Sequence, residues 1–545
     1  MSDMTDTGPM RAADGTPLKK SLARALRRQK LRALALIAPL LIFVLVTFVV
    51  PIGDMLFRSV ENQIVSDTLP NTIQRLAGWN PDSGEIPDEA VFAALAVDFQ
   101  AAAEEKNHTK LGTRLNYENP GMSSLFRKTG RGADDIGKNF QKTFTGFDKA
   151  WGKGEAWAAL LGSDKWLAAT EGWTKDAGPE PKFSARDEAE FALPLTTGVY
   201  RSFARVARAD GKKAAADTKP WPVLFNALAE DISSASPEAI AAIGGPSADL
   251  LKSAAQGLSS AEPISYKDTF VAIDKGWADL GTWQTIQAYA GDYTPGYFLN
   301  AVDLEKGTDG IKKRPDQQRI YLMLFWRTIW MSMLITGCCL LLGYPVAWIL
   351  ANLRASTANV LMILVLLPFW TSLLVRTSAW KVLLQQQGVI NDVLVWLGLV
   401  DDANRLVLIN NQFGTIVAMT HILLPFMILP LYSVMKTIPP AYLRAAKSLG
   451  ATNWTAFWRV YFPQSVPGIG AGAILCYILA IGYYITPELV GGTQGVFISN
   501  RIAFHISSSL NWGLAAALGA ILLGAVLLLY YVYDKIVGID NVKLG

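Results

Sequence analysis

The 545-residue chain is poor in the residues that most often carry chemistry, with three cysteines and three histidines. It contains no G-x-x-x-x-G-K-[ST], H-E-x-x-H, C-x-x-C or G-x-S-x-G pattern. These absences argue against a nucleotide-hydrolysing site, a zinc centre and a nucleophilic triad. We therefore expect the chain not to be an enzyme, with no catalytic residue, no metal site and no cofactor of its own.

The few cysteines also exclude one way of holding a domain together. Cys338, Cys339 and Cys476 all lie in strongly apolar runs. The polar part of the chain has none, so disulfides cannot stabilise it even in an oxidising compartment. That part has to be held by its own apolar core. The net charge of +4 is small and spread along the chain, which gives no sign of nucleic-acid binding.

Long apolar runs without charged residues are abundant in this sequence. Each is long enough to supply the ~20 apolar residues that cross a hydrocarbon core of ~30 Å. The runs are Ala33–Gly53, Thr328–Leu353, Ala355–Val375, Leu406–Met435, Val460–Pro487 and Ile502–Tyr533. They predict an all-α polytopic membrane protein with six transmembrane helices.

Basic residues next to the runs predict the orientation. They cluster in the N-terminal tail (Lys19, Lys20, Arg24, Arg27, Arg28, Lys30, Arg32), between the fourth and fifth runs (Lys436, Arg444, Lys447, Arg459) and at the C-terminus (Lys535, Lys543). Six spans place all three clusters on one side, which the positive-inside rule makes cytoplasmic. Residues 1–32 are thus a predicted cytoplasmic tail and 33–57 the first transmembrane helix. A cleaved signal peptide is the alternative, but the apolar core is too long and lacks an obvious A-x-A site.

Residues 58–319 form a predicted insertion between the first two spans, on the non-cytoplasmic side. Ala, Leu, Lys and Glu prevail over β-branched residues, which favours helix. Helix starts are predicted at Asp88 and at Ser236, where N-cap residues precede helix-forming sequence. Breaks are predicted at 119–121, 178–181 and 217–222, which are rich in Gly, Pro, Asn and Asp.

The insertion contains an internal repeat. The segment TFTGFDKAW at 143–151 matches TFVAIDKGW at 269–277, and a second tryptophan follows each, Trp157 and Trp283. Phe144, Phe147 and Trp151 recur at helical spacing, as do Phe270, Ile273 and Trp277. Two interpretations stay open: two similar core helices, or a duplicated helical unit whose pseudo-symmetric surface receives a soluble partner.

The loop 439–463 has the pattern of a helix–turn–helix. Pro439-Pro440 predicts a helix start at Ala441, and Gly450 a left-handed stop. Thr452 or Asn453 can cap a second helix through Trp454, Phe457 and Val460 to Pro463.

This loop resembles the "EAA" loop of bacterial ABC importer permeases. The resemblance rests on the spacing of Arg444, Ala445, Ala446, Gly450, Phe457, Val460 and Pro463. It implies the type I importer fold and a surface on which a separate ATPase, which holds ATP and Mg, docks. The family usually has glutamate where this chain has Arg444, so the partner groove is expected to offer an acid here.

The rest of 320–545 resembles the spermidine/putrescine class of these permeases. The matching segments are GYPVA at 343–347, which we expect to close the second span, LPFWTSLLVRT at 367–377, LPF at 424–426, which we expect to interrupt the fourth, and TPELVGG at 486–492. The resemblance covers residues 321 onward and the first span. It implies a second homologous permease, two ATPase subunits and a periplasmic substrate-binding protein as partners.

Polar and aromatic residues in or near the spans are candidates for the translocation pathway. They are Tyr344, Trp370, Arg376, Trp380, Tyr483, Tyr484 and Glu488. Glu488 could attract a cation at the cavity mouth, or Arg376 and Glu488 could extend towards the membrane interface or form a structural ion pair. His421 is expected to be a hydrogen-bonded interior histidine. The solute stays open between a polyamine and an opine, an amino-acid-like compound or iron. A membrane receptor with a periplasmic sensing domain is the alternative from another class.

Overall fold

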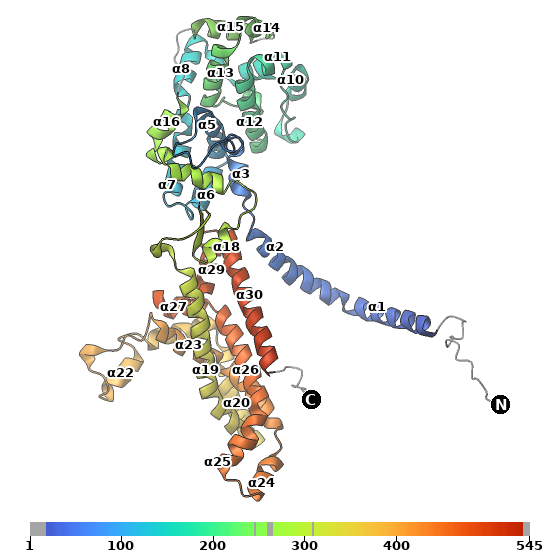
Figure 1. Cartoon of the computed structure of the whole chain (residues 1–545), viewed down its shortest axis with the longest axis vertical. Helices are drawn as coiled ribbons and strands as arrows, with labels where there is room; N and C mark the ends of the chain where they lie inside the picture. The colour runs from blue at the N-terminus through green and yellow to red at the C-terminus, as the bar shows by residue number, and fades with distance from the viewer. Residues whose placement is uncertain (1–17, 245–246, 259–264, 308–309, 538–545) are drawn as a thin grey trace, which may run out of the picture. The chain divides into compact units, whose positions relative to one another are not determined.

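The computed structural model describes residues 18–244, 247–258, 265–307 and 310–537 (Figure 1). The chain forms two compact units: residues 1–60 together with 320–545, and Glu61–Arg319. These limits agree closely with the predicted insertion at 58–319. Residues 1–17 of the basic tail, and Lys543, lie outside the described residues.

The membrane unit is built from long apolar helices. Those that could cross a bilayer alone are α1 with α2 (Leu18–Val44, Val50–Arg58, joined by a π turn), α19 (Tyr321–Asn352), α23 (Gln412–Thr437), α25 with α26 (Asn453–Ala456, Phe462–Gly482, also joined by a π turn) and α30 (Trp512–Val537). A sixth span requires α20 (Ala355–Leu366) and α21 (Leu373–Leu383) to count as one, although they meet at 93°. The all-α polytopic fold is confirmed.

The third span, predicted over the run 355–375, is sharply bent between α20 and α21. Pro368 lies in a 3₁₀ turn at Leu367–Trp370, and the extended Thr371 follows it. Ser372 then starts a new helix, because its hydroxyl accepts a hydrogen bond from the Val375 amide. Pro368, the extended Thr371 and the new N-cap at Ser372 together produce the bend.

Two other boundaries were predicted wrongly at prolines. Pro425 and Pro430 lie inside a continuous α23, so the segment 424–426 does not interrupt the fourth span. Pro345 likewise lies inside α19, which continues to Asn352 instead of closing near Ala347. Helices α19 and α26 pack on α23, and such packing tolerates the backbone groups that a proline frees.

Some predicted runs extend beyond the observed spans. The fourth span starts at Gln412 rather than Leu406, and the last starts at Trp512 rather than Ile502. The short helices between the spans are α22 (Val389–Trp396), α27 (Ile485–Val490), α28 (Gly492–Gly495) and α29 (Ile498–Ser507), of which α27 and α29 overlap the predicted runs. Apolarity alone could not separate them from a span.

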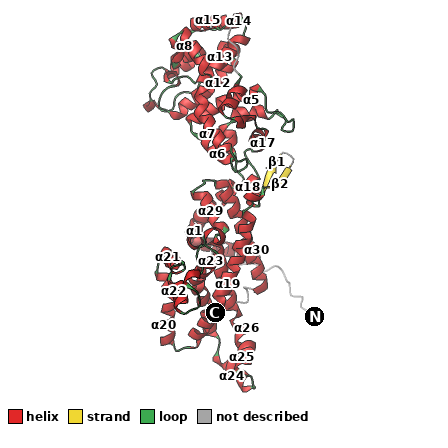
Figure 2. Cartoon of the chain, turned by 90° about the vertical axis from the view of Figure 1, so that its left-hand side faces the viewer, coloured by secondary structure: helices red, strands yellow, loops and turns green. Residues whose placement is uncertain are grey.

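The insertion is helical, as predicted. Its helices are α3 (Gln63–Thr68), α4 (Pro70–Leu76), α5 (Glu89–Glu104), α6 (Asn107–Leu115), α7 (Met122–Gly132), α8 (Lys138–Phe147), α9 (Gly154–Leu161), α10 (Asp164–Thr170), α11 (Asp187–Ala192), α12 (Pro194–Asp210), α13 (Pro222–Ser234), α14 (Pro237–Ala242), α15 (Ala248–Gly257), α16 (Tyr266–Ile273), α17 (Leu280–Ala288) and α18 (Gly296–Ala301). Asp88 and Ser236 cap α5 and α14 as expected. One small hairpin, β1 (Leu304–Gly307) with β2 (Gly310–Lys313), is the exception (Figure 2).

The two matching segments have the same local structure. Each is a helix, a 3₁₀ turn started by an aspartate, and a second helix, instead of the single helix that was predicted. The Trp157 indole donates to the Trp151 carbonyl at 2.9 Å, and Trp283 donates to Trp277 at 2.9 Å. Because the helix ends at Phe147, that ring leaves the buried stripe and is 40% exposed.

The repeat extends to a helix pair that the sequence comparison missed. Asp98 on α5 accepts hydrogen bonds from the Thr72 amide and hydroxyl, both at 2.7 Å. Asp231 on α13 accepts the same two bonds from Thr196, both at 2.7 Å. The helices α4–α9 and α12–α17 therefore form two copies of one unit, here called the first and second copy.

The copies exchange their aromatic segments. Phe92 on α5 of the first copy packs on Trp283 and Phe270 of the second, with ring centroids 4.8 and 5.8 Å apart. Phe225 on α13 of the second copy packs on Trp157 and Phe144 of the first, at 4.9 and 5.8 Å. The two segments thus pack in equivalent ways, and both are core, so the insertion is a duplicated helical unit.

Candidate coupling loop and translocation pathway

The loop between α23 and α26 folds as the helix–turn–helix that was predicted. Helix α24 (Pro440–Ser448) begins at the proline pair, and Gly450 has a φ of +87°, which favours glycine. Thr452 then caps α25 by accepting from the Thr455 amide at 3.2 Å. The predicted end at Pro463 is wrong: Pro463 lies in the first turn of α26, where a proline is tolerated.

The tip of this loop exposes apolar side chains. Leu449 is 89% exposed and Trp454 is 72% exposed, and α24 has no buried residue. Arg444 and Ala445 are exposed beside them, and Ala446 is half-buried. The side chain of Arg444 makes no ion pair with any described residue. Such an exposed apolar tip is typical of a surface that a partner covers.

The second half of the loop is anchored in the membrane unit by aromatic contacts. Phe457 packs edge-on against Tyr344 at 6.2 Å and stacks with Tyr461 at 5.9 Å. The Tyr344 hydroxyl lies 2.9 Å from that of Ser465 on α26. Val460 is half-buried and Pro463 exposed. Tyr344 therefore belongs to the base of the loop and not to the group of pathway candidates around α21.

Other pathway candidates gather around α21. The Trp380 indole on α21 donates to His421 Nδ1 on α23 at 3.1 Å, so His421 is hydrogen-bonded as expected. The Arg376 guanidinium acts electrostatically on His421 and on Tyr483 at the end of α26. The Nε of Arg376 is buried without a hydrogen-bond partner among the described residues. A cation, an imidazole and two aromatic rings thus lie close together.

The remaining candidates lie apart from this group or are held by other residues. Trp370 is 70% exposed in the turn before α21, and Tyr484 is 46% exposed. The Glu488 carboxylate accepts from the Asn500 amide nitrogen at 2.6 Å, and among the described residues no ion pair joins it to Arg376. Within this chain Glu488 is therefore held by Asn500, and the roles of Arg376 and Glu488 stay predictions.

Sequence reasoning missed two polar residues on α29. Asn500 bonds Glu488 and also donates to the Tyr484 carbonyl at 2.9 Å, which ties α29 to the chain after α26. His505 is buried, with the Tyr321 hydroxyl 3.0 Å from its Nε2. His505 could have been noticed in the sequence as a titratable residue inside the apolar run 502–533.

Comparison with known proteins matches the membrane unit. The family model "Binding-protein-dependent transport system inner membrane component" matches residues 343–538. The spermidine/putrescine transport system permease protein PotB of Haemophilus influenzae is 36% identical over 214 residues, covering 39% of this chain and 74% of that protein. PotB of Escherichia coli is 34% identical over 215 residues, covering 39% and 78%. A solved bacterial ABC transporter that imports alginate matches with a TM-score of 0.34 at 19% identity, over 42% of this chain and 81% of that one.

Apolar helices of membrane-spanning length define a polytopic membrane protein. More specifically, the chain belongs to the family of binding-protein-dependent inner-membrane components, as an ABC importer permease of the polyamine class. It is a multi-pass inner-membrane protein and a transport subunit rather than a catalytic one.

Proposed function

We propose that this permease forms the translocation pathway for a polyamine such as spermidine or putrescine. The solute follows from relatives at 34–36% identity that carry spermidine/putrescine in their names. The same machinery importing an opine, an amino-acid-like compound or iron is the alternative.

Coupling to a separate ATPase is the second part of the proposal. The observation that carries it is the exposed apolar tip of the 439–463 loop, with Leu449 and Trp454 at its apex. An ATPase that covers this tip on the cytoplasmic side would hold ATP and Mg. Its closure would move the rigid α24–α25 elbow, and the continuous α25–α26 helix would carry that movement into the membrane.

The proposed assembly contains a second homologous permease, two ATPase subunits and a periplasmic substrate-binding protein. The first span supports a membrane partner, because none of its most apolar 18-residue window is buried within this chain. Lipid or a second permease has to cover it. The charge pattern supports a topology with both termini in the cytoplasm and residues 58–319 in the periplasm.

Uptake in proteoliposomes containing the whole complex tests coupling. Leu449→Asp places a carboxylate in the apolar tip, and we expect ATP-dependent spermidine uptake to fall by more than tenfold. Leu399→Asp is the matched control, because Leu399 is 69% exposed in a different loop, and it should keep uptake within twofold.

Two outcomes would contradict separate parts of the proposal. Unchanged uptake by Leu449→Asp would remove the loop as the coupling surface. ATP turnover that responds to the binding protein without spermidine or putrescine movement would leave the permease assignment intact but overturn the solute.

A further inference from the structure

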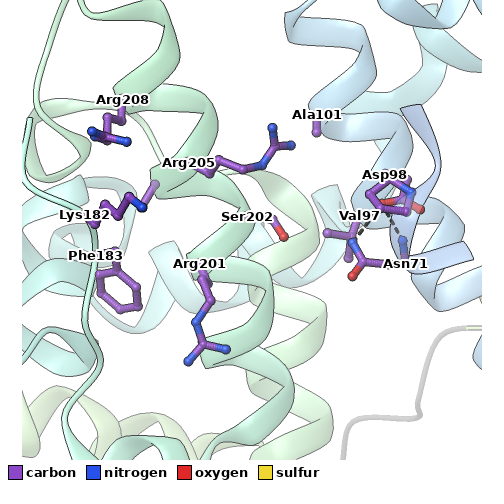
Figure 3. A pocket seen from close by; sticks show the side chains of 12 residues that line it. Asn71, Val97, Asp98, Ala101, Lys182, Phe183, Arg201, Ser202, Arg205 and Arg208 are labelled. Carbon is purple, nitrogen blue, oxygen red and sulfur yellow. Dashed lines mark hydrogen bonds between the residues drawn. The ribbon is translucent and has the colours of Figure 1, made fainter. Parts of the chain in front are cut away.

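A basic pocket lies inside the insertion, between the two copies. It has a volume of about 470 Å³ and is lined by α4 and α5 of the first copy, α12 of the second, and the segment at Lys182-Phe183 (Figure 3). Pockets of ~300–1,000 Å³ are typical of small-molecule sites. The size suits a small solute rather than a protein surface.

One wall of this pocket is strongly positive. Arg201, Arg205 and Arg208 follow one another at i, i+4 and i+7, which places them on one face of α12. Lys182 adds a fourth cation and forms no ion pair with any described residue. Arg205 extends across the pocket towards Ala101 and Asp98 on α5 (Figure 3).

The single acid in the lining does not neutralise this wall. Both carboxylate oxygens of Asp98 accept hydrogen bonds from the first copy, Oδ1 from the Asn71 side chain at 2.8 Å and Oδ2 from Thr72. Asp98 is thus occupied in fixing α4 to α5. Its equivalent, Asp231, makes the same contacts in the second copy, so this role belongs to the duplicated fold.

Two of the three arginines have weakly held partners, whereas the Nε of Arg208 donates to the Glu180 carbonyl oxygen. Arg201 pairs with Glu190 at 2.7 Å and Arg205 with Glu105 at 3.6 Å, and the side chains in these pairs are between 31% and 58% exposed. Exposed pairs of this kind contribute ~0–1 kcal/mol. A ligand carboxylate or phosphate that accepts two parallel guanidinium hydrogen bonds forms a stronger contact.

The duplicated fold does not by itself require the basic face. Helix α4 is the first-copy counterpart of α12, because Thr72 and Thr196 hold equivalent positions. It ends at Leu76, whereas α12 continues to Asp210 and carries all three arginines on the part without a counterpart in α4. The charged face is therefore an addition to the second copy alone.

From this geometry we propose that the pocket binds a small anion with two or more carboxylate or phosphate groups. Such a ligand spans the guanidinium groups of Arg201 and Arg205 and reaches Lys182. The site lies in the periplasmic insertion and is independent of the solute that crosses the membrane.

Isothermal titration of the full-length permease in lipid nanodiscs tests the proposal, with citrate and inorganic phosphate as probes and spermidine as the cationic comparison. We expect citrate or phosphate to bind and spermidine not to compete. Arg201→Gln with Arg205→Gln should weaken anion binding by at least tenfold. Arg127→Gln with Arg131→Gln on α7 removes the same charge from outside the pocket lining and should change binding by less than twofold.

The proposal is overturned if neither anion binds the wild-type protein at millimolar concentration. It is also overturned if both double variants weaken binding equally, since that would indicate a general charge effect. A third contrary result is loss of affinity for the substrate-binding protein in the α12 variant without any anion binding, which would make the face a protein contact. Spermidine uptake by the α12 variant is expected to persist, so failure here leaves the transport proposal untouched.

Discussion

The two units of this chain bury opposite kinds of residue. Among the described residues, the largest fully buried side chains all lie in the insertion, including Trp151, Trp157, Trp277 and Trp283. In the membrane unit several tryptophans are exposed, such as Trp326 and Trp370, each 70% exposed, while glycines fill helix contacts. Water drives aromatic burial in a soluble domain, whereas lipid is as apolar as a leucine core and rewards close helix approach.

Removal of a buried tryptophan from the insertion is expected to have the largest effect on stability and tests the contrast between the two units. Trp157→Ala or Trp283→Ala removes a fully buried ring, and we expect each to lower the opening free energy of the insertion by about 3–5 kcal/mol. Hydrogen exchange on the full-length protein in nanodiscs measures this effect. Trp326→Ala, at an exposed site, is the control; a similar loss there would contradict the contrast between the units.

Asp98 is expected to make the insertion sensitive to pH. Burial raises the pKa of Asp98 from 3.8 to about 6, so the folded state holds this proton more tightly than the unfolded state does. The stabilisation from protonation is complete below about pH 4 and is lost as the pH rises towards 6, a change of ~3 kcal/mol.

Asp98→Asn should flatten the pH dependence of hydrogen exchange in the insertion between pH 4 and 6. Asp231→Asn should act in the same direction, because burial also raises the pKa of Asp231. Asp82→Asn, at an exposed position, should leave the profile unchanged. An unaltered profile in Asp98→Asn would contradict the assignment.

Gly472 tests the close packing of the membrane unit. A Cβ at this position would lie 2.7 Å from Met427 Sδ and 3.2 Å from the Met427 carbonyl oxygen, so the buried Met427 side chain would have to move and α23 would have to shift slightly away from α26. We expect Gly472→Ala to cost ~1–3 kcal/mol, seen as a lower melting temperature in detergent. Gly482→Ala, in the same helix with open space around it, should melt like the wild type.

The smallest expected effect is at the cap of the coupling loop. Thr452→Ala removes the hydroxyl that accepts from the Thr455 amide, which costs ~1 kcal/mol of helix stability. Uptake per ATP hydrolysed should fall severalfold while binding-protein affinity is kept. Thr437→Ala, at an exposed residue before the loop, should behave as the wild type; equal ratios in both variants would exclude a role for the cap.

Local signals predicted the loop better than the spans. Gly450 and Thr452 act through their own backbone and nearest neighbours, so sequence was enough to place the stop and the cap. The bend after Pro368 and the continuity through Pro425 depend on what packs beside them, which a single sequence does not display. The contacts of Tyr344 were not predicted for the same reason, since its partners Phe457 and Ser465 lie far along the chain.

The sequence predicted that the insertion is helical and contains a repeat. It did not predict that each copy packs on the aromatic segment of the other. The matching segments at 143–151 and 269–277 were visible because their aromatic residues are similar. The helix pairs α4–α5 and α12–α13 share few residues beyond a Leu-Pro-x-Thr start and one aspartate, so their equivalence emerged from the hydrogen bonds. The roles of the pathway residues and of the coupling surface stay predictions.

The exchange of aromatic segments affects the order in which the insertion can fold during synthesis. Phe92 cannot find its ring partners until Phe270 and Trp283, near the far end of the insertion, have been made. Contacts so distant along the chain close slowly, and apolar surface stays open meanwhile. We therefore expect the first copy to complete its folding only after almost the whole insertion has left the ribosome. Until then it should be the part of the chain that depends most on a chaperone.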